Sequence, residues 1–181
     1  MIAAGIPGRK IAIVEPGHDL PRGTSRPSAD LRGGKKLAVL NVANWLPNKG
    51  ILDLVDAVDR IPSDEVVLHL VGSPELDARY SKAIRARLDD PGLRGKVVTH
   101  GVLPQGQLVE LYTGADVLVV TSREEGYGTV IAEALGLGLP VIAWLSGYLA
   151  NLYEDGTEGF QIPAGDVSRL TGTIRRLAHD E

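Results

Sequence analysis

The chain has 181 residues, 44% of them apolar and only 4% aromatic, which suits a single globular domain whose core is mainly aliphatic. The formal net charge is −4 and the acidic and basic residues are intermixed, which argues against nucleic-acid binding. The absence of cysteine excludes disulfides, thiolate metal sites and a cysteine nucleophile.

The first 35 residues differ in composition from the rest of the chain. Residues 10–14 are predicted to form a short strand. Residues 18–34 are rich in glycine, proline, serine and charge, without periodicity, as in a linker. We therefore divide the chain into a strand and linker (residues 1–35) and one folded domain (residues 36–181).

From residue 36 onward, short apolar runs alternate with amphipathic segments, which is the pattern of strands followed by helices. Short connections between such elements favour a doubly wound, mostly parallel α/β sheet of the Rossmann type. Asp166 is the expected N-cap of the last helix. Strands are predicted at residues 37–42, 66–71, 97–99, 117–120, 140–143 and 160–162, and helices at about 52–58, 75–88, 105–113, 129–137 and 167–178, with a helical turn at 149–153.

The densest group of chemically informative residues comes directly after the predicted strand 117–120. In an open α/β sheet, ligands bind beyond the carboxyl ends of the strands, so this position favours a binding site. Gly126 and Gly128 permit backbone conformations that other residues avoid, and they allow a ligand to come close. The helix expected to begin at Thr129 presents free N–H groups and the positive end of its dipole, which suits a phosphate. A Gly-x-Gly sequence alone is a weak signal, and an ordinary turn is the alternative.

Glu133 stands in a helix whose other residues are apolar or small, so we expect this helix to be largely buried. An unpaired buried carboxylate is costly, and the spacing of four residues places Glu133 on the same side of the helix as Thr129. We therefore expect Glu133 to face the cleft and to accept hydrogen bonds from a vicinal diol such as that of a ribose. The alternative is a structural contact with the backbone or with an arginine.

Lys49 follows the first strand of the folded domain and precedes the next helix. From there it can reach toward a diphosphate, and an ordinary solvated lysine is the alternative. The backbone of residues 101–103, after the third strand, suits hydrogen bonding to the edge of a base. The neighbouring His100 is expected to be structural or incidental, because no carboxylate is placed to pair with it.

Several segments together resemble a known family. Residues 122–128 and 133–143 are similar to the Glu-x7-Glu region of retaining glycosyltransferases of the GT-B type, in the group 1 family typified by sucrose-phosphate synthases and mannosyltransferases. Residues 47–50 resemble the lysine turn of that family. The similarity runs in order from about Lys36 to the C-terminus and also includes residues 111–117, 153–160 and 163–166.

The resemblance implies two Rossmann-like domains, of which the C-terminal one binds the nucleotide-sugar donor. On this basis Glu125 would face the donor sugar and Lys49 would neutralise the diphosphate, so we assign the catalytic roles to these two residues. Glu133 would hold the ribose hydroxyls, and the backbone at Val102 would contact the base. The implied reaction is transfer of a hexose with retention at the anomeric carbon, without a bound metal and with no cofactor besides the donor substrate. The backbone amides expected at the diphosphate belong to Gly126, Tyr127, Gly128 and Thr129.

The chain departs from the family pattern at two positions and lacks one half. Asn44 stands where the family usually has an arginine, five residues before Lys49, which removes a positive charge from the donor site. Residues 146–148 read Ser-Gly-Tyr in place of a Gly-Gly turn. The N-terminal half of the family, with acceptor contacts and usually a catalytic histidine, has no counterpart before Lys36. We expect this acceptor domain to be a partner from the same protein, joined through an interdomain strand and linker. The chemical identity of the acceptor is left open, and a lipid or membrane-associated acceptor is included among the possibilities.

Three functions are weighed against these observations. The first is the donor-binding domain of a glycosyltransferase, inactive or nearly so without its other half, and the second is a non-catalytic nucleotide-sugar-binding or interaction module. The third, an unrelated α/β phosphate-binding enzyme such as a dinucleotide-dependent reductase, is disfavoured because no Gly-x-Gly-x-x-Gly follows the first strand. The apolar runs at 116–120 and 130–139 are too short to cross a bilayer and the N-terminus has no signal-peptide pattern, so we expect a cytoplasmic protein.

Overall fold

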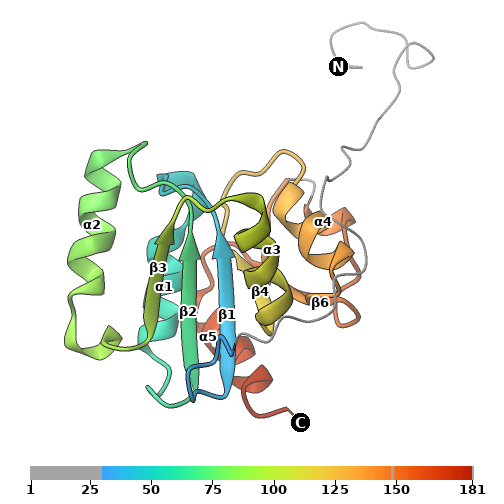
Figure 1. The fold of residues 1–181 in the computed structure, drawn as a ribbon. Coiled ribbons are helices and arrows are strands. Elements are labelled where there is room, and N and C mark those ends of the chain that lie inside the picture. Colours follow the sequence, from blue (N-terminus) through green and yellow to red (C-terminus); the bar gives the residue numbers. More distant parts are fainter. Residues whose placement is uncertain (1–29, 148, 181) are drawn as a thin grey trace, which may run out of the picture.

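The computed structural model describes residues 30–147 and 149–180, which form one six-stranded sheet flanked by helices (Figure 1). Neighbouring strands all pair in parallel, in the order β3-β2-β1-β4-β5-β6, so the predicted doubly wound sheet is confirmed and is parallel throughout. The strand predicted at residues 10–14, and Tyr148, lie outside the described residues. The strands are β1 (Leu37–Val42), β2 (Val66–Val71), β3 (Val97–Gly101), β4 (Val117–Val120), β5 (Val141–Leu145) and β6 (Gly159–Pro163).

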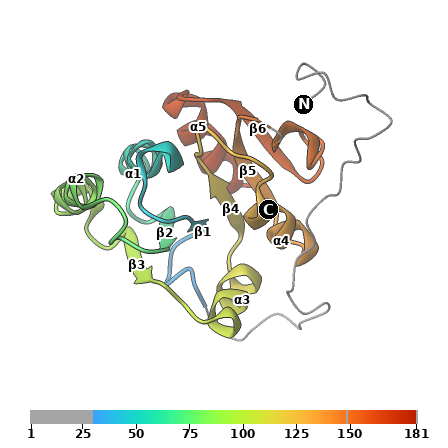
Figure 2. The ribbon, with the colours of Figure 1, turned by 90° about the horizontal axis from the view of Figure 1, so that it is seen from above.

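Helices cover both faces of the sheet, as the view from above shows (Figure 2). In β1, Val39 packs in the core under α1, α2 and α5, while its neighbour Leu40 packs in the core under α3 and α4. This burial on both faces explains why the strands read as continuous aliphatic runs. Within the described part of the chain, none of the helices combines the length and apolar character needed to cross a bilayer. The helices are α1 (Ile51–Asp59), α2 (Ala78–Leu88), α3 (Gln105–Gly114), α4 (Thr129–Gly136) and α5 (Val167–Leu177), with short 3-10 helices η3 (Pro47–Lys49), η4 (Pro91–Leu93) and η5 (Leu149–Asn151).

The starts of two helices are set by capping side chains. α2 begins at Ala78 and not near residue 75, because Asp77 is its N-cap and accepts a hydrogen bond from Tyr80 N at 2.8 Å. α5 begins where the sequence predicts, after Asp166, whose Oδ1 accepts a hydrogen bond from Arg169 N at 2.9 Å. The cap predicted at Asp166 is therefore confirmed.

Helix α4 is less buried than its apolar sequence indicates. Ile131 and Ala134 are its buried residues, whereas Val130, Glu133 and Leu135 are partly exposed. The helix rests on the sheet through one side, and the described residues cover its other side only in part. The expectation that the helix around Glu133 is largely buried is therefore wrong, and Glu133 lies at the border between core and surface.

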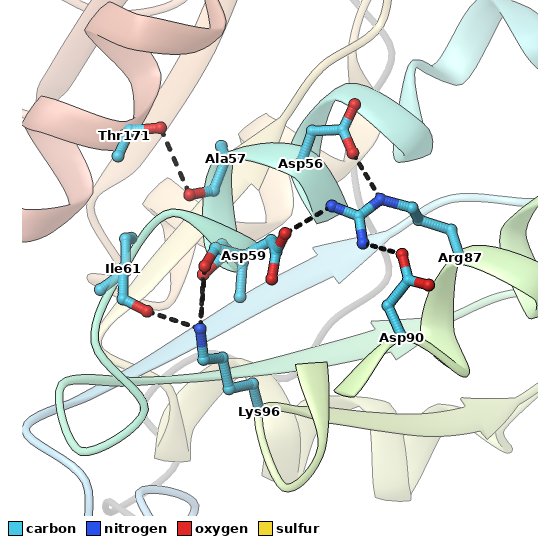
Figure 3. Close-up of polar contacts among 9 residues, drawn as sticks. Asp56, Ala57, Asp59, Ile61, Arg87, Asp90, Lys96 and Thr171 are labelled. Carbon is cyan, nitrogen blue, oxygen red and sulfur yellow. Dashed lines mark hydrogen bonds and ion pairs between the residues drawn. The ribbon is translucent and has the colours of Figure 1, made fainter. Parts of the chain in front are cut away.

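A buried lysine directly before β3 ties the end of α1 to the sheet (Figure 3). Lys96 is 4% exposed, and its Nζ donates hydrogen bonds to the carbonyl oxygens of Asp59 at 3.0 Å and Ile61 at 2.5 Å. The end of a helix leaves such carbonyls without helical donors, so the ammonium group caps α1. Burial lowers the pKa of Lys96. Arg87 of α2 adds ion pairs to Asp56 at 2.8 Å and to Asp59 at 2.7 Å, so this cluster holds α1, α2 and the sheet together.

The strand order creates a crevice between β1 and β4. From β1 the chain winds outward through β2 and β3, and from β4 it winds outward the other way through β5 and β6. Helix α1 follows β1 on one face of the sheet, and α4 follows β4 on the opposite face. The chain therefore continues to opposite faces of the sheet after β1 and after β4, and ligands of open α/β sheets bind at such a point.

Candidate functional site

A pocket of about 250 Å³ opens where the strand order reverses. Its walls come from the carboxyl ends of β1 and β4, from the loops that follow them, from Gly72 after β2 and from the start of α4. The structure thus brings together five of the residues that the sequence singled out: Asn44, Lys49, Glu125, Gly128 and Thr129. The remaining lining residues are Val42, Ala43, Gly72, Val120, Ser122 and Val130.

Lys49 is held at the pocket because its turn is fixed to the loop after β4. Thr121 Oγ1 donates a hydrogen bond to the carbonyl of Lys49 at 3.0 Å, and Arg123 N donates to the carbonyl of Asn48 at 2.7 Å. Gly50 has a φ of +62°, and a Cβ there would lie 2.2 Å from the carbonyl oxygen of Thr121. Glycine is therefore required for the two loops to come this close.

The side chains of Lys49 and Glu125 form an ion pair in the pocket, with Nζ 2.6 Å from Oε2. The two side chains are 23% and 18% exposed, so solvent screens their attraction only in part. The two residues to which we assign catalytic roles are therefore in direct contact. Their roles toward a donor stay predictions.

The start of α4 contributes backbone to the pocket. Gly128 is the N-cap of α4 with a φ of +85°, so the predicted need for glycine is met at this position. Gly126 has no positive φ, so the special conformation expected of both glycines applies to Gly128 alone. Tyr127 is half-buried between them. The first N–H groups of a helix have no intrahelical acceptor, and Thr129 and Val130 both line the pocket.

Asn44, where the resemblance implies an arginine, makes a contact between two loops. Its Oδ1 accepts a hydrogen bond from Ser73 N at 2.9 Å and so joins the loops after β1 and β2. Lys49 is then the one cationic side chain among the residues that line the pocket, and its charge is balanced by Glu125. The pocket therefore has no surplus positive charge from its side chains.

Glu133 lies one helical turn beyond Thr129 and does not line this pocket. Its Oε2 accepts a hydrogen bond from Tyr112 Oη on α3 at 2.8 Å, a partner that is neither backbone nor arginine. Tyr112 is 1% exposed; burial, together with the nearby carboxylate, raises its pKa above the ordinary value of 10.0. The hydroxyl therefore stays protonated and donates. The role of Glu133 toward a ribose stays a prediction.

The segment after β3 lies open to solvent at Val102, which is 73% exposed. His100 at the end of β3 has a partner that the sequence did not indicate, since its Nε2 lies 2.9 Å from Nδ1 of His69 on β2. The Nε2 of His69 lies 2.9 Å from the carbonyl oxygen of Leu31. Burial and the neighbouring His69 lower the pKa of His100. These contacts fit the structural role expected for His100.

Sequence reasoning missed the hydroxyl of Tyr112 and the contact that Asn44 makes with Ser73. A tyrosine on the buried side of a helix is a signal for the first, because a buried hydroxyl needs a hydrogen-bond partner. The second depends on how closely two loops approach, which the sequence does not reveal. Within residues 30–147 and 149–180, no group of three or more histidine or acidic side chains is arranged to hold a metal ion.

The folded domain matches a family that is described as Glycosyl transferases group 1, over residues 36–180. The D-inositol 3-phosphate glycosyltransferase of Acidothermus cellulolyticus is 31% identical over 178 residues, which cover 94% of this chain and 39% of that protein. The chain spans about a third to two fifths of the length of the curated relatives it matches.

Two solved structures share the fold. HepE of Anabaena, crystallised in complex with UDP-glucose, superposes with a TM-score of 0.72 at 28% identity, over 80% of this chain and 39% of its own. The sucrose-phosphate synthase of Thermosynechococcus elongatus gives a TM-score of 0.75 at 31% identity, over 88% of this chain and 43% of its own. With a family match across the whole folded domain and a Rossmann-like sheet shared with GT-B glycosyltransferases, the chain belongs to the group 1 glycosyl transferases.

Proposed function

We propose that this chain is the donor-binding domain of a retaining glycosyltransferase, which transfers a hexose from a nucleotide-diphosphate sugar to an acceptor held by a second domain. The observation that carries the proposal is the shared position of Lys49 and the start of α4 in one pocket at the carboxyl ends of β1 and β4. A cation and a helix N-terminus that face the same space suit a phosphate group. HepE, which has a similar fold, was crystallised with UDP-glucose.

The size of the pocket suits one part of such a donor. At about 250 Å³ it lies below the roughly 300–1,000 Å³ that is usual for complete small-molecule sites. We therefore assign it to the diphosphate and the adjoining sugar, with Lys49 and the first amides of α4 at the diphosphate and Glu125 at the sugar. The nucleoside then lies beyond the pocket, with its ribose at Glu133 and its base at the backbone around Val102.

The proposed reaction breaks the bond between the anomeric carbon and a diphosphate oxygen. Negative charge develops on that oxygen, and Lys49 together with the N-terminus of α4 stabilises it. Because protein groups supply this positive charge, we expect transfer without a bound metal. Retention at the anomeric carbon rests on the resemblance to retaining GT-B enzymes.

A non-catalytic nucleotide-sugar-binding module is the second candidate, and one observation favours it. Asn44 adds no charge to the pocket, and its amide oxygen is engaged by Ser73 N. Lys49 is paired with Glu125, so less positive charge is available to a leaving diphosphate than two cations would supply. Under this alternative the site binds a donor without transferring the sugar.

Isothermal titration calorimetry of the chain against UDP, GDP and ADP, and against their glucose and mannose conjugates, tests the proposal. We expect at least one diphosphate to bind. Lys49→Ala should weaken that binding by about 10- to 100-fold, which corresponds to a lost charge-assisted contact of about 1.5–3 kcal/mol. Lys82→Ala is the matched control, because Lys82 is exposed on α2 and does not line the pocket. Absence of binding by all three diphosphates, or an equal effect of both substitutions, contradicts the proposal.

Release of nucleoside diphosphate from the bound nucleotide sugar separates the two candidates. A protein that joins this chain to an acceptor-binding half is expected to release the diphosphate in the presence of acceptor, and Glu125→Gln should abolish most of that activity. Donor binding without release supports the non-catalytic module. Efficient transfer by the chain alone contradicts the assignment of the acceptor to a second domain.

A further inference from the structure

We infer that Tyr112 is a positioning residue, which presents the Glu133 carboxylate to the ribose of the donor and thereby sets a preference for ribonucleotides over deoxyribonucleotides. The inference rests on the proposed function, in which Glu133 binds the ribose. The observation behind it is the hydrogen bond from Tyr112 Oη to Glu133 Oε2, at 2.8 Å, between α3 and α4.

The two side chains meet because of the directions in which their helices run. α3 begins beyond the carboxyl end of β3 and runs back along the sheet (Figure 1). Tyr112 belongs to the last turn of α3. α4 begins beyond the carboxyl end of β4, and Glu133 lies in its second turn. Long side chains on a helix lean toward the N-terminus of that helix. The phenol of Tyr112 and the carboxylate of Glu133 meet between the two helices, where Tyr112 Oη donates to Glu133 Oε2 at 2.8 Å.

The burial of the two groups differs, and this difference decides which of them a ligand can reach. Tyr112 is 1% exposed in the core between the sheet, α3 and α4, whereas Glu133 is partly exposed. Among the described residues, Tyr112 is the one hydrogen-bond donor to the Glu133 side chain. A carboxylate has about four acceptor positions, so one phenol hydroxyl leaves enough for both hydroxyls of a ribose.

The hydroxyl of Tyr112 is a permanent donor. Its pKa is raised first by burial and then by the Glu133 carboxylate, so it stays protonated wherever that carboxylate is ionised. A carboxylate that is already held in one orientation loses less conformational freedom when a ribose binds. The gain applies to ligand hydroxyls and not to the phosphates or the base.

Tyr112→Phe tests the inference, because it removes the hydroxyl and keeps the ring that fills the core. Calorimetry with whichever of UDP, GDP and ADP binds, and with its 2′-deoxy and 3′-deoxy analogues, gives the ratio of affinities, here called the ribose preference. We expect a preference of about tenfold or more in the wild type, from the lost hydrogen bond to a carboxylate. Tyr112→Phe should lower the preference by about two- to tenfold, because the ribonucleotide loses the benefit for two hydroxyls and each deoxy analogue, which keeps one hydroxyl, loses less affinity. Combined with Glu133→Gln, it should lower the preference no further than Glu133→Gln alone.

Tyr153→Phe is the matched control. Tyr153 is a second buried tyrosine, 8% exposed, whose hydroxyl donates to the carbonyl oxygen of Phe160 at 3.2 Å and does not contact Glu133. It should keep the wild-type preference, and urea unfolding should show that both variants fold. An unchanged preference in Tyr112→Phe, or an equal loss in Tyr153→Phe, overturns the inference while leaving the proposed function intact. A preference that survives Glu133→Gln overturns the ribose role of Glu133 and this inference with it, and absence of any diphosphate binding overturns the proposed function itself.

Discussion

Lys49 and Glu125 are 76 positions apart in the chain, and their charged groups lie 2.6 Å apart where the strand order of the sheet reverses. They are the cationic and the anionic side chain among the residues that line the pocket. Under the proposed function, a diphosphate that approaches Lys49 has to compete with the Glu125 carboxylate for the ammonium group. Donor binding then releases Glu125 from Lys49 and leaves it available to the sugar.

Glu125→Gln is therefore predicted to tighten the binding of a nucleoside diphosphate without a sugar. Glutamine keeps the size of the side chain and removes the charge that repels phosphate, so we expect a gain of about three- to tenfold, or roughly 1 kcal/mol at a partly exposed site. Calorimetry at low and high salt checks the prediction, because screening should reduce the gain at high salt. Glu124→Gln is the control, since Glu124 is exposed in the same loop and does not line the pocket. Weaker diphosphate binding in Glu125→Gln, or the same gain in Glu124→Gln, would show that the ion pair does not compete with the ligand.

Two substitutions of Asn44 are predicted to change the affinity for a diphosphate in opposite directions. Asn44→Arg adds a second cation to the pocket and should tighten diphosphate binding by about tenfold, the equivalent of about 1.4 kcal/mol. Asn44→Asp keeps an oxygen that can accept the hydrogen bond from Ser73 N and adds a negative charge, so it should weaken binding. Titration calorimetry of both variants measures the two effects. If Asn44→Arg fails to tighten diphosphate binding, or Asn44→Asp fails to weaken it, the charge at this position does not govern the affinity.

The fold was predictable because the sheet is parallel and buried on both faces. β1, β2 and β4 match the predicted residues, since strands in such a sheet need apolar side chains on both sides. The edge strand β3 extends two residues past its predicted end, to Gly101. Its polar residues Thr99 and His100, neither of them buried, interrupt the apolar run, which is why the pattern stopped early.

The site was predictable in its parts and not in its contacts. Lys49 and Gly128 were found because residues that follow strands converge at one edge of the sheet. The pairing of Lys49 with Glu125 depends on side-chain positions across two loops, which no spacing along the chain encodes. The expected burial of Glu133 was wrong, because the sequence of α4 shows only that the helix is apolar. How far the helix is buried depends on what covers the side that faces away from the sheet.

Two glycines in the loop before α4 differ in whether a side chain can be added without loss of stability. Gly128 has a φ of +85°, and a Cβ there would lie 2.3 Å from Cδ2 of the buried Leu149. Gly128→Ala should therefore lower the free energy of unfolding by about 1–3 kcal/mol, from backbone strain and repacking. Gly126 lacks a positive φ, and a Cβ added there would meet no heavy atom within 4 Å, so Gly126→Ala should stay within about 0.5 kcal/mol of the wild type. Urea unfolding of both variants checks the difference, and equal stabilities would contradict the strained geometry at Gly128.

Glu65 gives a prediction of how stability depends on pH. It lies just before β2, is 6% exposed, and its Oε2 and Oε1 lie 3.1 Å from Arg175 Nε and 3.1 Å from His179 Nε2 near the end of α5. The hydrogen bond from Arg175 is the main reason that the pKa of Glu65 is held below its ordinary value of 4.5; burial opposes this shift. A carboxyl group whose pKa is lower in the folded than in the unfolded state binds fewer protons when folded. Its contribution to stability is therefore present above about pH 4.5 and is lost as the pH falls through the pKa of the folded state.

Glu65→Gln should lower the free energy of unfolding by about 1 kcal/mol at pH 7, and the deficit should shrink as the pH falls below about 4.5. The reason is that the wild-type carboxyl group becomes protonated and loses its charge, after which it differs little from the amide. Urea unfolding of the wild type and the variant at pH 7, 5, 4 and 3.5 measures this convergence. Glu110→Gln is the control, because Glu110 is exposed on α3, and its stability difference should stay near zero at every pH. A deficit for Glu65→Gln that is constant with pH, or that grows in acid, would mean that the charge of Glu65 does not hold the end of α5 against the start of β2.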